Sequence, residues 1–142
     1  MGDVYGVNYT KSLDPTVQTN LLSPGLWDGK VRVQVDTYEC ESLANASVIY
    51  VAKLPKGAVF LGISNIVADD LGSATTLSAG IVGTADLFLA ATVFTTAGQQ
   101  TILNAIAGCQ YVFTAALPDV ILTVGAEVAD GTIKTEIYYA RE

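Results

Sequence analysis

From Lys30 onward the sequence is a succession of short β-prone segments separated by glycine and proline, and this pattern constrains the fold most. Val31, Val33 and Val35 alternate with polar residues, which is the period of a strand with one buried face. Short strands joined by glycine-containing turns are typical of sandwiches and barrels. We therefore predict an all-β fold, an antiparallel β-sandwich over residues 31–142. Further strands are expected at 47–54, 58–67, 75–82, 86–90, 111–115 and 120–126, and a short helix is expected only at Gln99–Ala107.

The C-terminal part of this pattern predicts a β-hairpin. Asp130-Gly131 is a dipeptide typical of a two-residue type I′ turn. Such a turn would set Val128 opposite Ile133, and it would set Glu127 opposite Lys134 on the other face. The apolar match and the charge pair require the same register, so we expect the strand over 120–126 to pair with the end of the chain.

Residues 1–30 have a different character. They contain glycines, Pro15 and Pro24 and show no sustained hydrophobic period, so we predict an extended N-terminal arm. The arm is too apolar for a free tail, and the sequence is compatible with packing either on its own domain or on a neighbouring subunit. Aromatic residues dominate the binding hot spots of protein interfaces. The candidate partner-binding residues are Tyr5, Tyr9, Leu26 and Trp27.

The composition argues against most chemistry. The chain has no histidine, which is the commonest general base and a common metal ligand, so serine or cysteine nucleophiles lack their usual partner. Seven basic residues against 14 acidic ones give a net charge of -7, which disfavours binding to nucleic acid. We predict that the protein is not an enzyme and has no catalytic, cofactor or metal site.

Three local features have structural explanations. Cys40 and Cys109 are expected to be free thiols or small hydrophobic residues, although a disulfide between them is compatible with the sequence. The carboxylates that flank Cys40 should raise its thiol pKa. Asp69-Asp70 is expected in a solvated turn, because the calcium alternative lacks the EF-hand spacing. Gly80–Gly83 is expected to be a bulge or bend between strands.

The distribution of charged and apolar residues indicates a protein that contacts other proteins. The chain is 51% hydrophobic and 15% charged, and apolar runs such as 88–94 exceed what one small core hides, so we expect a homo-oligomer. No basic residue occurs from 57 to 133, and the acidic residues of that span lie mainly at expected turns. One end of the sandwich should therefore be acidic.

No targeting or membrane segment is expected. The N-terminus lacks the basic and apolar regions of a signal peptide. The uncharged stretch 87–118 is interrupted by the polar residues of 95–101, so no apolar run is long enough for a membrane span. We expect a soluble protein made inside a cell, with no membrane partner.

Three segments resemble those of small tailed-phage virion proteins. Tyr50–Ala58 resembles their K-L-P-K/A-G-A strand-turn-strand segment, and Ala68–Gly80 resembles their D-x-L-G-x-x-T-T-L-x-x-G segment. Asp86–Thr92, followed by Ala97-Gly98, is similar to their D-x-F-L-A-A-T…A-G segment. Together these matches cover roughly 30–139. The family is that of the tailed-bacteriophage capsid decoration (cement) proteins.

The resemblance implies a jelly-roll-like fold and a structural function. Proteins of this family are often trimeric, bind outside the phage head and clamp neighbouring major capsid subunits. It therefore implies the phage major capsid protein and a homotrimer as partners, with synthesis in the host cytoplasm and a final place on the outer surface of the virion. Two alternatives are another virion subunit, from the tail or a fibre, and a carbohydrate-binding β-sandwich. The carbohydrate reading requires exposed aromatic platforms, whereas Trp27, the single tryptophan, lies outside the expected strands.

Overall fold

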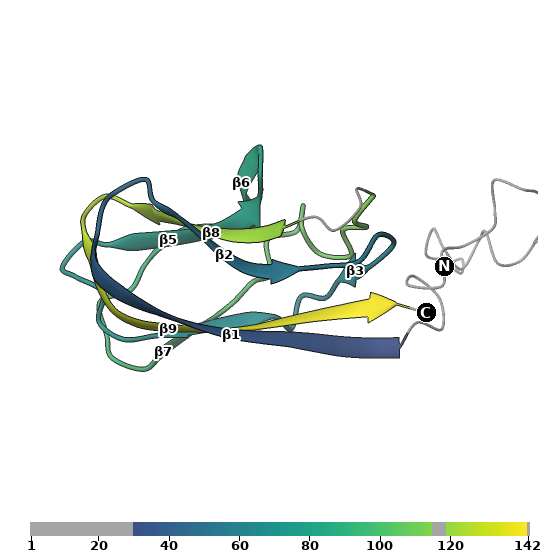
Figure 1. Ribbon diagram of the computed structural model, residues 1–142, viewed down its shortest axis with the longest axis horizontal. Helices are drawn as coiled ribbons and strands as arrows, with labels where there is room; N and C mark the ends of the chain where they lie inside the picture. The colour runs from purple at the N-terminus through teal and green to yellow at the C-terminus, as the bar shows by residue number, and fades with distance from the viewer. Residues whose placement is uncertain (1–29, 115–118, 142) are drawn as a thin grey trace, which may run out of the picture.

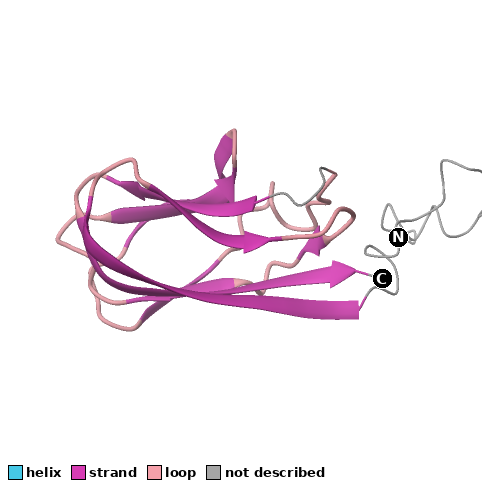
Figure 2. Cartoon of the chain, in the orientation of Figure 1, coloured by secondary structure: helices cyan, strands magenta, loops and turns pink. Residues whose placement is uncertain are grey.

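A computed structural model of the chain describes residues 30–114 and 119–141, and within these residues it contains strands and no helix (Figure 2). The strands are β1 (Lys30–Leu43), β2 (Val48–Lys53), β3 (Val59–Phe60), β4 (Asn65–Ala68), β5 (Thr76–Ile81), β6 (Thr84–Val93), β7 (Gln99–Ile102), β8 (Asp119–Gly125) and β9 (Ala129–Arg141). None of the described residues forms a helix that could cross a membrane. The prediction of an all-β fold is confirmed.

The strands form two antiparallel sheets that pack face to face (Figure 1). The first sheet has the order β1-β9-β4-β7, with β3 also paired to β9, and the second has the order β2-β8-β5-β6. Most successive strands alternate between the sheets, which is the connectivity of a jelly roll. The predicted antiparallel sandwich of jelly-roll type is therefore present, and β1 and β2 form neighbouring edges of the two sheets.

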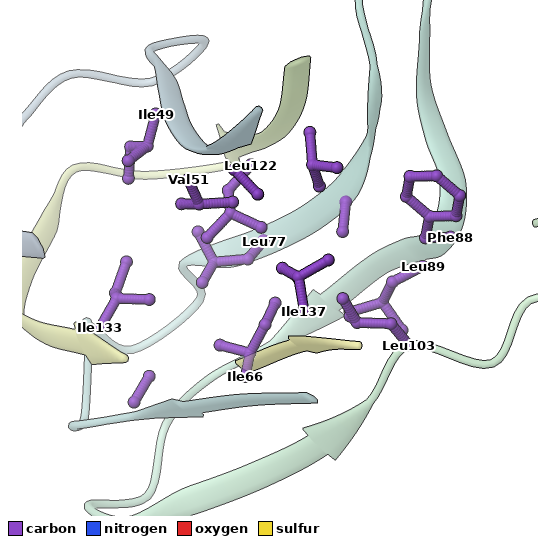
Figure 3. Close-up of a cluster of buried hydrophobic side chains, with 14 of the residues drawn as sticks. Ile49, Val51, Ile66, Leu77, Phe88, Leu89, Leu103, Leu122, Ile133 and Ile137 are labelled. Atoms are coloured by element: carbon purple, nitrogen blue, oxygen red, sulfur yellow. The ribbon is translucent and has the colours of Figure 1, made fainter. Parts of the chain in front are cut away.

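The core lies between the sheets. Ile66, Ile133 and Ile137 of the first sheet face Leu77 and Leu122 of the second sheet, and all five side chains are buried (Figure 3). Removing such side chains from water is the main favourable term in folding. Aromatic rings close the core near β3 and β6, where Phe60, Phe88, Tyr111 and Phe113 contact one another.

The β1 strand confirms the predicted alternation but contradicts the predicted burial. Val31, Val33 and Val35 do lie on one face of a strand, yet that face points away from the core. The inward face carries Gln34 and Cys40 instead, and Cys40 is buried. Alternation identifies a strand, but it does not state which of its faces a second sheet covers.

The predicted C-terminal hairpin is wrong. Asp130-Gly131 lies inside β9, where Gly131 is opposite Cys40 of β1, while β8 pairs with β2 and β5 in the other sheet. The chain crosses between the sheets at 126–128, with Ala126 in a left-handed conformation at φ 66°. Core packing against both sheets outweighs the local turn preference of one dipeptide.

Other local predictions are corrected in the same way. The expected helix at Gln99–Ala107 is instead strand β7 followed by irregular chain, because 99–102 pair with β4. The expected strand 58–67 divides into β3 and β4 at Ser64, whose hydroxyl lies 2.9 Å from Leu61 O and accepts a hydrogen bond from Tyr138 N at 2.8 Å. Within 111–114, the only strand-like pairing is an isolated bridge between Val112 and Val59. The expected bend at Gly80–Gly83 is present as the turn from β5 to β6.

Candidate partner-binding surface

The four residues predicted to bind a partner, Tyr5, Tyr9, Leu26 and Trp27, lie outside the described residues. The described part of the chain shows where the sandwich itself offers surface for another protein. Its largest feature of this kind is β1, which has 14 residues, 11 of them exposed. An ordinary strand in a sandwich has one face covered, so a strand exposed on both faces is available for contact.

A valine stripe, consisting of Val31, Val33 and Val35, runs along the outer face of β1. Its side chains are 62%, 47% and 70% exposed. The register places Val33 beside Tyr138 and Val35 beside Glu136 on β9, so the stripe borders polar side chains on the neighbouring strand. The alternating pattern identifies these residues as one face of a strand, but the prediction that this face lies in the core is wrong.

Polar side chains occupy the centre of the same outer face. The Glu136 carboxylate accepts hydrogen bonds from Tyr138 Oη at 3.1 Å and from Asn65 Nδ2 at 3.4 Å. The hydrogen bond to Glu136, and then its negative charge, raise the pKa of the Tyr138 phenol. Beyond Asn65, the register places the half-exposed Ile102 at the far edge. This outer face is thus apolar at both edges and hydrogen-bonded in the middle.

An open groove of about 400 Å³ lies between the edges of the two sheets. The Gln34 carboxamide crosses it, donating to Lys53 O at 2.8 Å and accepting from Lys53 N at 3.1 Å. The aromatic ring of Tyr50 lines the groove and is 60% exposed, and Asp119 forms an ion pair with Lys53 at 3.7 Å. The groove is polar and open, which suits contact with a protein better than enclosure of a small ligand.

Charged residues lie at both ends of the sandwich. Strand pairing puts Lys30 beside Arg141 at the end where β1 begins. At the other end, Asp130 accepts a hydrogen bond from the main-chain amide of Ser42. Thr132 donates its main-chain amide to Asp69 and its hydroxyl to Glu39. The expected acidic end is therefore present in part, opposite the end where β1 begins (Figure 1), whereas Asp119 lies at the other end and pairs with Lys53.

The described residues do not assemble a reactive centre. Within 30–114 and 119–141, no group of three potential metal-ligating side chains comes together. Cys40 and Cys109 are both free thiols, so the alternative of a disulfide is excluded. Burial, followed by the negative charges of Glu39 and Asp130, raises the pKa of the Cys40 thiol, as expected from the sequence. A raised pKa disfavours the nucleophilic thiolate.

Comparisons with solved structures identify proteins of the same fold. A chain of the cyanophage Pam1 capsid asymmetric unit matches with a TM-score of 0.68 and 25% identity, over 80% of this chain and 86% of that one. A chain of the Ralstonia phage GP4 capsid matches with a TM-score of 0.66 and 23% identity over the same shares. The acid-stable capsid of Helicobacter pylori bacteriophage KHP30 contains a chain with a TM-score of 0.55 and 16% identity, over 78% and 86% of the two chains.

The sequence comparisons give no match. No family model matches this chain, and a search of curated proteins finds none at significance. The similarity is therefore detected in the three-dimensional structure, and it relates the described domain to chains of phage capsids. These neighbours are consistent with a structural protein of a phage virion.

Proposed function

We propose that this protein is a capsid decoration (cement) protein, a virion component that binds the outside of a phage head and clamps neighbouring major capsid subunits. The observation that carries the proposal is the match with a chain of the Pam1 capsid asymmetric unit, which extends over 80% of this chain at 25% identity. The resemblance of three sequence segments to cement proteins supports the same assignment independently of the coordinates.

The surface chemistry fits this function. A cement protein needs contact area and no reactive group, and stable protein contacts bury about 1,200–2,000 Å². The described domain offers the exposed valine stripe and the open groove, and the carboxylates of Glu39, Asp69 and Asp130 lie at the end remote from the start of β1. In the proposed orientation, the end that carries Lys30 and Arg141 faces the head, and the acidic end faces solvent.

The proposal assigns the head contact to the N-terminal arm together with this basic end. Tyr5, Tyr9, Leu26 and Trp27 are proposed as its anchors, because buried aromatic residues carry much of the binding energy in protein interfaces. The functional unit is proposed to be a homotrimer, in which three arms bind the head together and gain affinity through multivalency.

Sedimentation with phage heads that lack this protein tests the assignment. The full-length protein should co-sediment with the heads, and the variant Tyr5→Ala/Tyr9→Ala/Leu26→Ala/Trp27→Ala should bind them at least about tenfold more weakly. A control variant, Val128→Ala, changes a half-exposed side chain at the acidic end of the sandwich and should bind normally. Absence of co-sedimentation by the unmodified protein would contradict the proposal, and equal binding of the arm variant would remove the role of the arm.

A tail or fibre position is the competing virion assignment, because a β-sandwich suits those parts as well. Electron microscopy of phage particles carrying a gold-labelled antibody against this protein separates the two. Label over the head supports the decoration function, whereas label confined to the tail supports the alternative. Light scattering of the purified protein should give the mass of a trimer.

A further inference from the structure

The outer edge of β1 is an unpaired strand edge. β1 is the terminal strand of the first sheet and pairs only with β9 among the described residues. It contains no proline, and its pairing with β9 is regular from Lys30 to Cys40. A long, regular and exposed strand edge is a template for pairing with another strand, and natural proteins normally shorten, twist or cover such edges.

The sequence of this edge is complementary to itself. If two copies of β1 pair in antiparallel orientation around a two-fold axis at Gln34, Arg32 of each copy lies opposite Asp36 of the other. The same register sets Val33 opposite Val35, so the two valine stripes join on the outer face. Side chains directly opposite in an antiparallel pair must lie on the same face of the sheet. With the axis at Gln34, every pair from 30 to 38 joins two side chains that lie on the same face of β1.

The two neighbouring registers make different contacts. Moving the axis by one residue toward the C-terminus sets Val31 opposite Glu39 and Arg32 opposite Tyr38. Moving it by one residue toward the N-terminus sets Arg32 opposite Gln34, Lys30 opposite Asp36 and Val31 opposite Val35, and within the described residues this register pairs only 30–36. Both shifts separate Arg32 from Asp36. A two-fold contact places the same patch of both copies in the interface, so each favourable pair is formed twice.

The charges of Arg32 and Asp36 have no ionic partner within the described residues, although Asp36 Oδ1 accepts a hydrogen bond from Thr37 N at 2.8 Å. Within the described residues the ion pair of Lys53 with Asp119 is the only one, so Arg32 and Asp36 have no ionic partner there. Both side chains are exposed. The valines of the stripe are exposed as well, and burying apolar area of this size is favourable.

We propose that β1 pairs with β1 of a second copy of this chain around a two-fold axis at Gln34, joining two first sheets into one continuous sheet. The contact goes beyond the proposed three-fold oligomer, since it links a protomer of one trimer to a protomer of the next. One strand-to-strand contact buries less area than a standard protein interface and is weak by itself. Repetition over a surface makes such a contact effective through avidity.

Reciprocal charge variants test the contact and its register. We expect sedimentation velocity of the full-length protein to show concentration-dependent association beyond its basic oligomer. Arg32→Asp and Asp36→Arg should each weaken this association by about tenfold or more, because each sets like charges opposite one another twice. An equimolar mixture of the two variants restores both pairs and should regain the wild-type association. Melting temperatures close to that of the wild type would show that both variants fold.

Two matched valine variants test the apolar part. Val33→Glu should abolish the association, whereas Val82→Glu, at a 66% exposed position of the β5–β6 turn, should leave it unchanged. A mixture that fails to associate, or single variants that associate like the wild type, would overturn the proposal. These measurements use no phage heads, so their failure is distinguishable from a failure of head binding in co-sedimentation.

Discussion

The side chain of Gln34 forms two hydrogen bonds with the main chain of Lys53, donating to its carbonyl at 2.8 Å and accepting from its amide at 3.1 Å. The carboxamide bonds to the main chain at the edge of β2 as a neighbouring strand would, and it thereby links the edges of the two sheets. Hydrogen bonds of this kind contribute about 0.5–1.5 kcal/mol each to the free energy of unfolding.

Gln34→Ala should therefore lower the free energy of unfolding by about 1–2 kcal/mol. Urea denaturation followed by circular dichroism measures the change. Gln100→Ala provides the control, because Gln100 is an exposed glutamine on β7 at the far edge of the first sheet, and its replacement should change stability by less than about 0.5 kcal/mol. Equal effects of the two substitutions would contradict a bridging role for Gln34.

The ring of Phe88 attaches β6 to the core. It is fully buried, and it stacks on Phe60 with ring centroids 3.9 Å apart. Phe88→Ala should reduce the free energy of unfolding by about 3–5 kcal/mol, because it removes apolar contacts and leaves a cavity. Val93→Ala, at a half-exposed position of the same strand, should cost less than about 1 kcal/mol. Thermal denaturation distinguishes these outcomes, and a mild effect of Phe88→Ala would show that the ring is not part of the stabilising core.

A buried hydroxyl connects the chain before β5 to the crossover between the sheets. Thr75 Oγ1 lies 2.9 Å from Val128 O and 3.2 Å from Leu71 O, and Thr75 is fully buried. Thr75→Val preserves the shape of the side chain and removes the donor, so we expect a loss of about 1–3 kcal/mol in unfolding free energy. Thr92→Val removes a more exposed hydroxyl that donates to Ala90 O, and it should be nearly neutral in the same chemical denaturation experiment. An unchanged unfolding free energy in Thr75→Val would show that the hydrogen bond from Thr75 to the Val128 carbonyl does not stabilise the fold.

The two thiols should differ in reactivity. Cys40 is 3% exposed and its pKa is raised, whereas Cys109 is partly exposed. Iodoacetamide at pH 8 should alkylate Cys109 of the folded protein well before Cys40, and both should react alike in urea, as mass spectrometry of the peptides will show. Rapid alkylation of Cys40 in the folded protein would contradict its burial.

The raised pKa of Cys40 also predicts a dependence on pH. The folded state favours the neutral thiol, so this contribution to stability is complete below the ordinary thiol pKa and is lost as pH rises through the raised value. The difference in unfolding free energy between the wild type and Cys40→Ala should decrease over that alkaline range. If this difference in unfolding free energy does not change with pH, the titration of Cys40 does not contribute to the pH dependence of stability.

Local patterns in the sequence identified most strands, because alternation and turn residues act over a few neighbouring positions. Val31, Val33 and Val35 belong to β1, and the turn at Pro55–Gly57 follows β2 as expected. The strand over 120–126 agrees with β8 to within one residue at each end. The composition likewise excluded histidine chemistry without any structure.

The partners of those strands could not be derived in this way. The Asp130-Gly131 dipeptide has a strong turn preference, but in the structure it lies inside β9. Glycine is favoured at position 131 because its φ is 114° and a Cβ there would lie 3.1 Å from Asp69 Cβ. The pairing of β9 with β1 joins residues about 100 positions apart, and its free energy comes from the core of the whole sandwich.

The sequence by itself determined most of the strands and the lack of a histidine-dependent site, because each depends on residue type and near neighbours. Only the tertiary structure decided which face of β1 is covered. The second sheet packs against the side that carries Cys40, so the valine stripe is left on the outside and becomes a surface for a partner. Burial depends on the arrangement of strands that are distant in sequence, and a period of two residues is the same whichever face is buried.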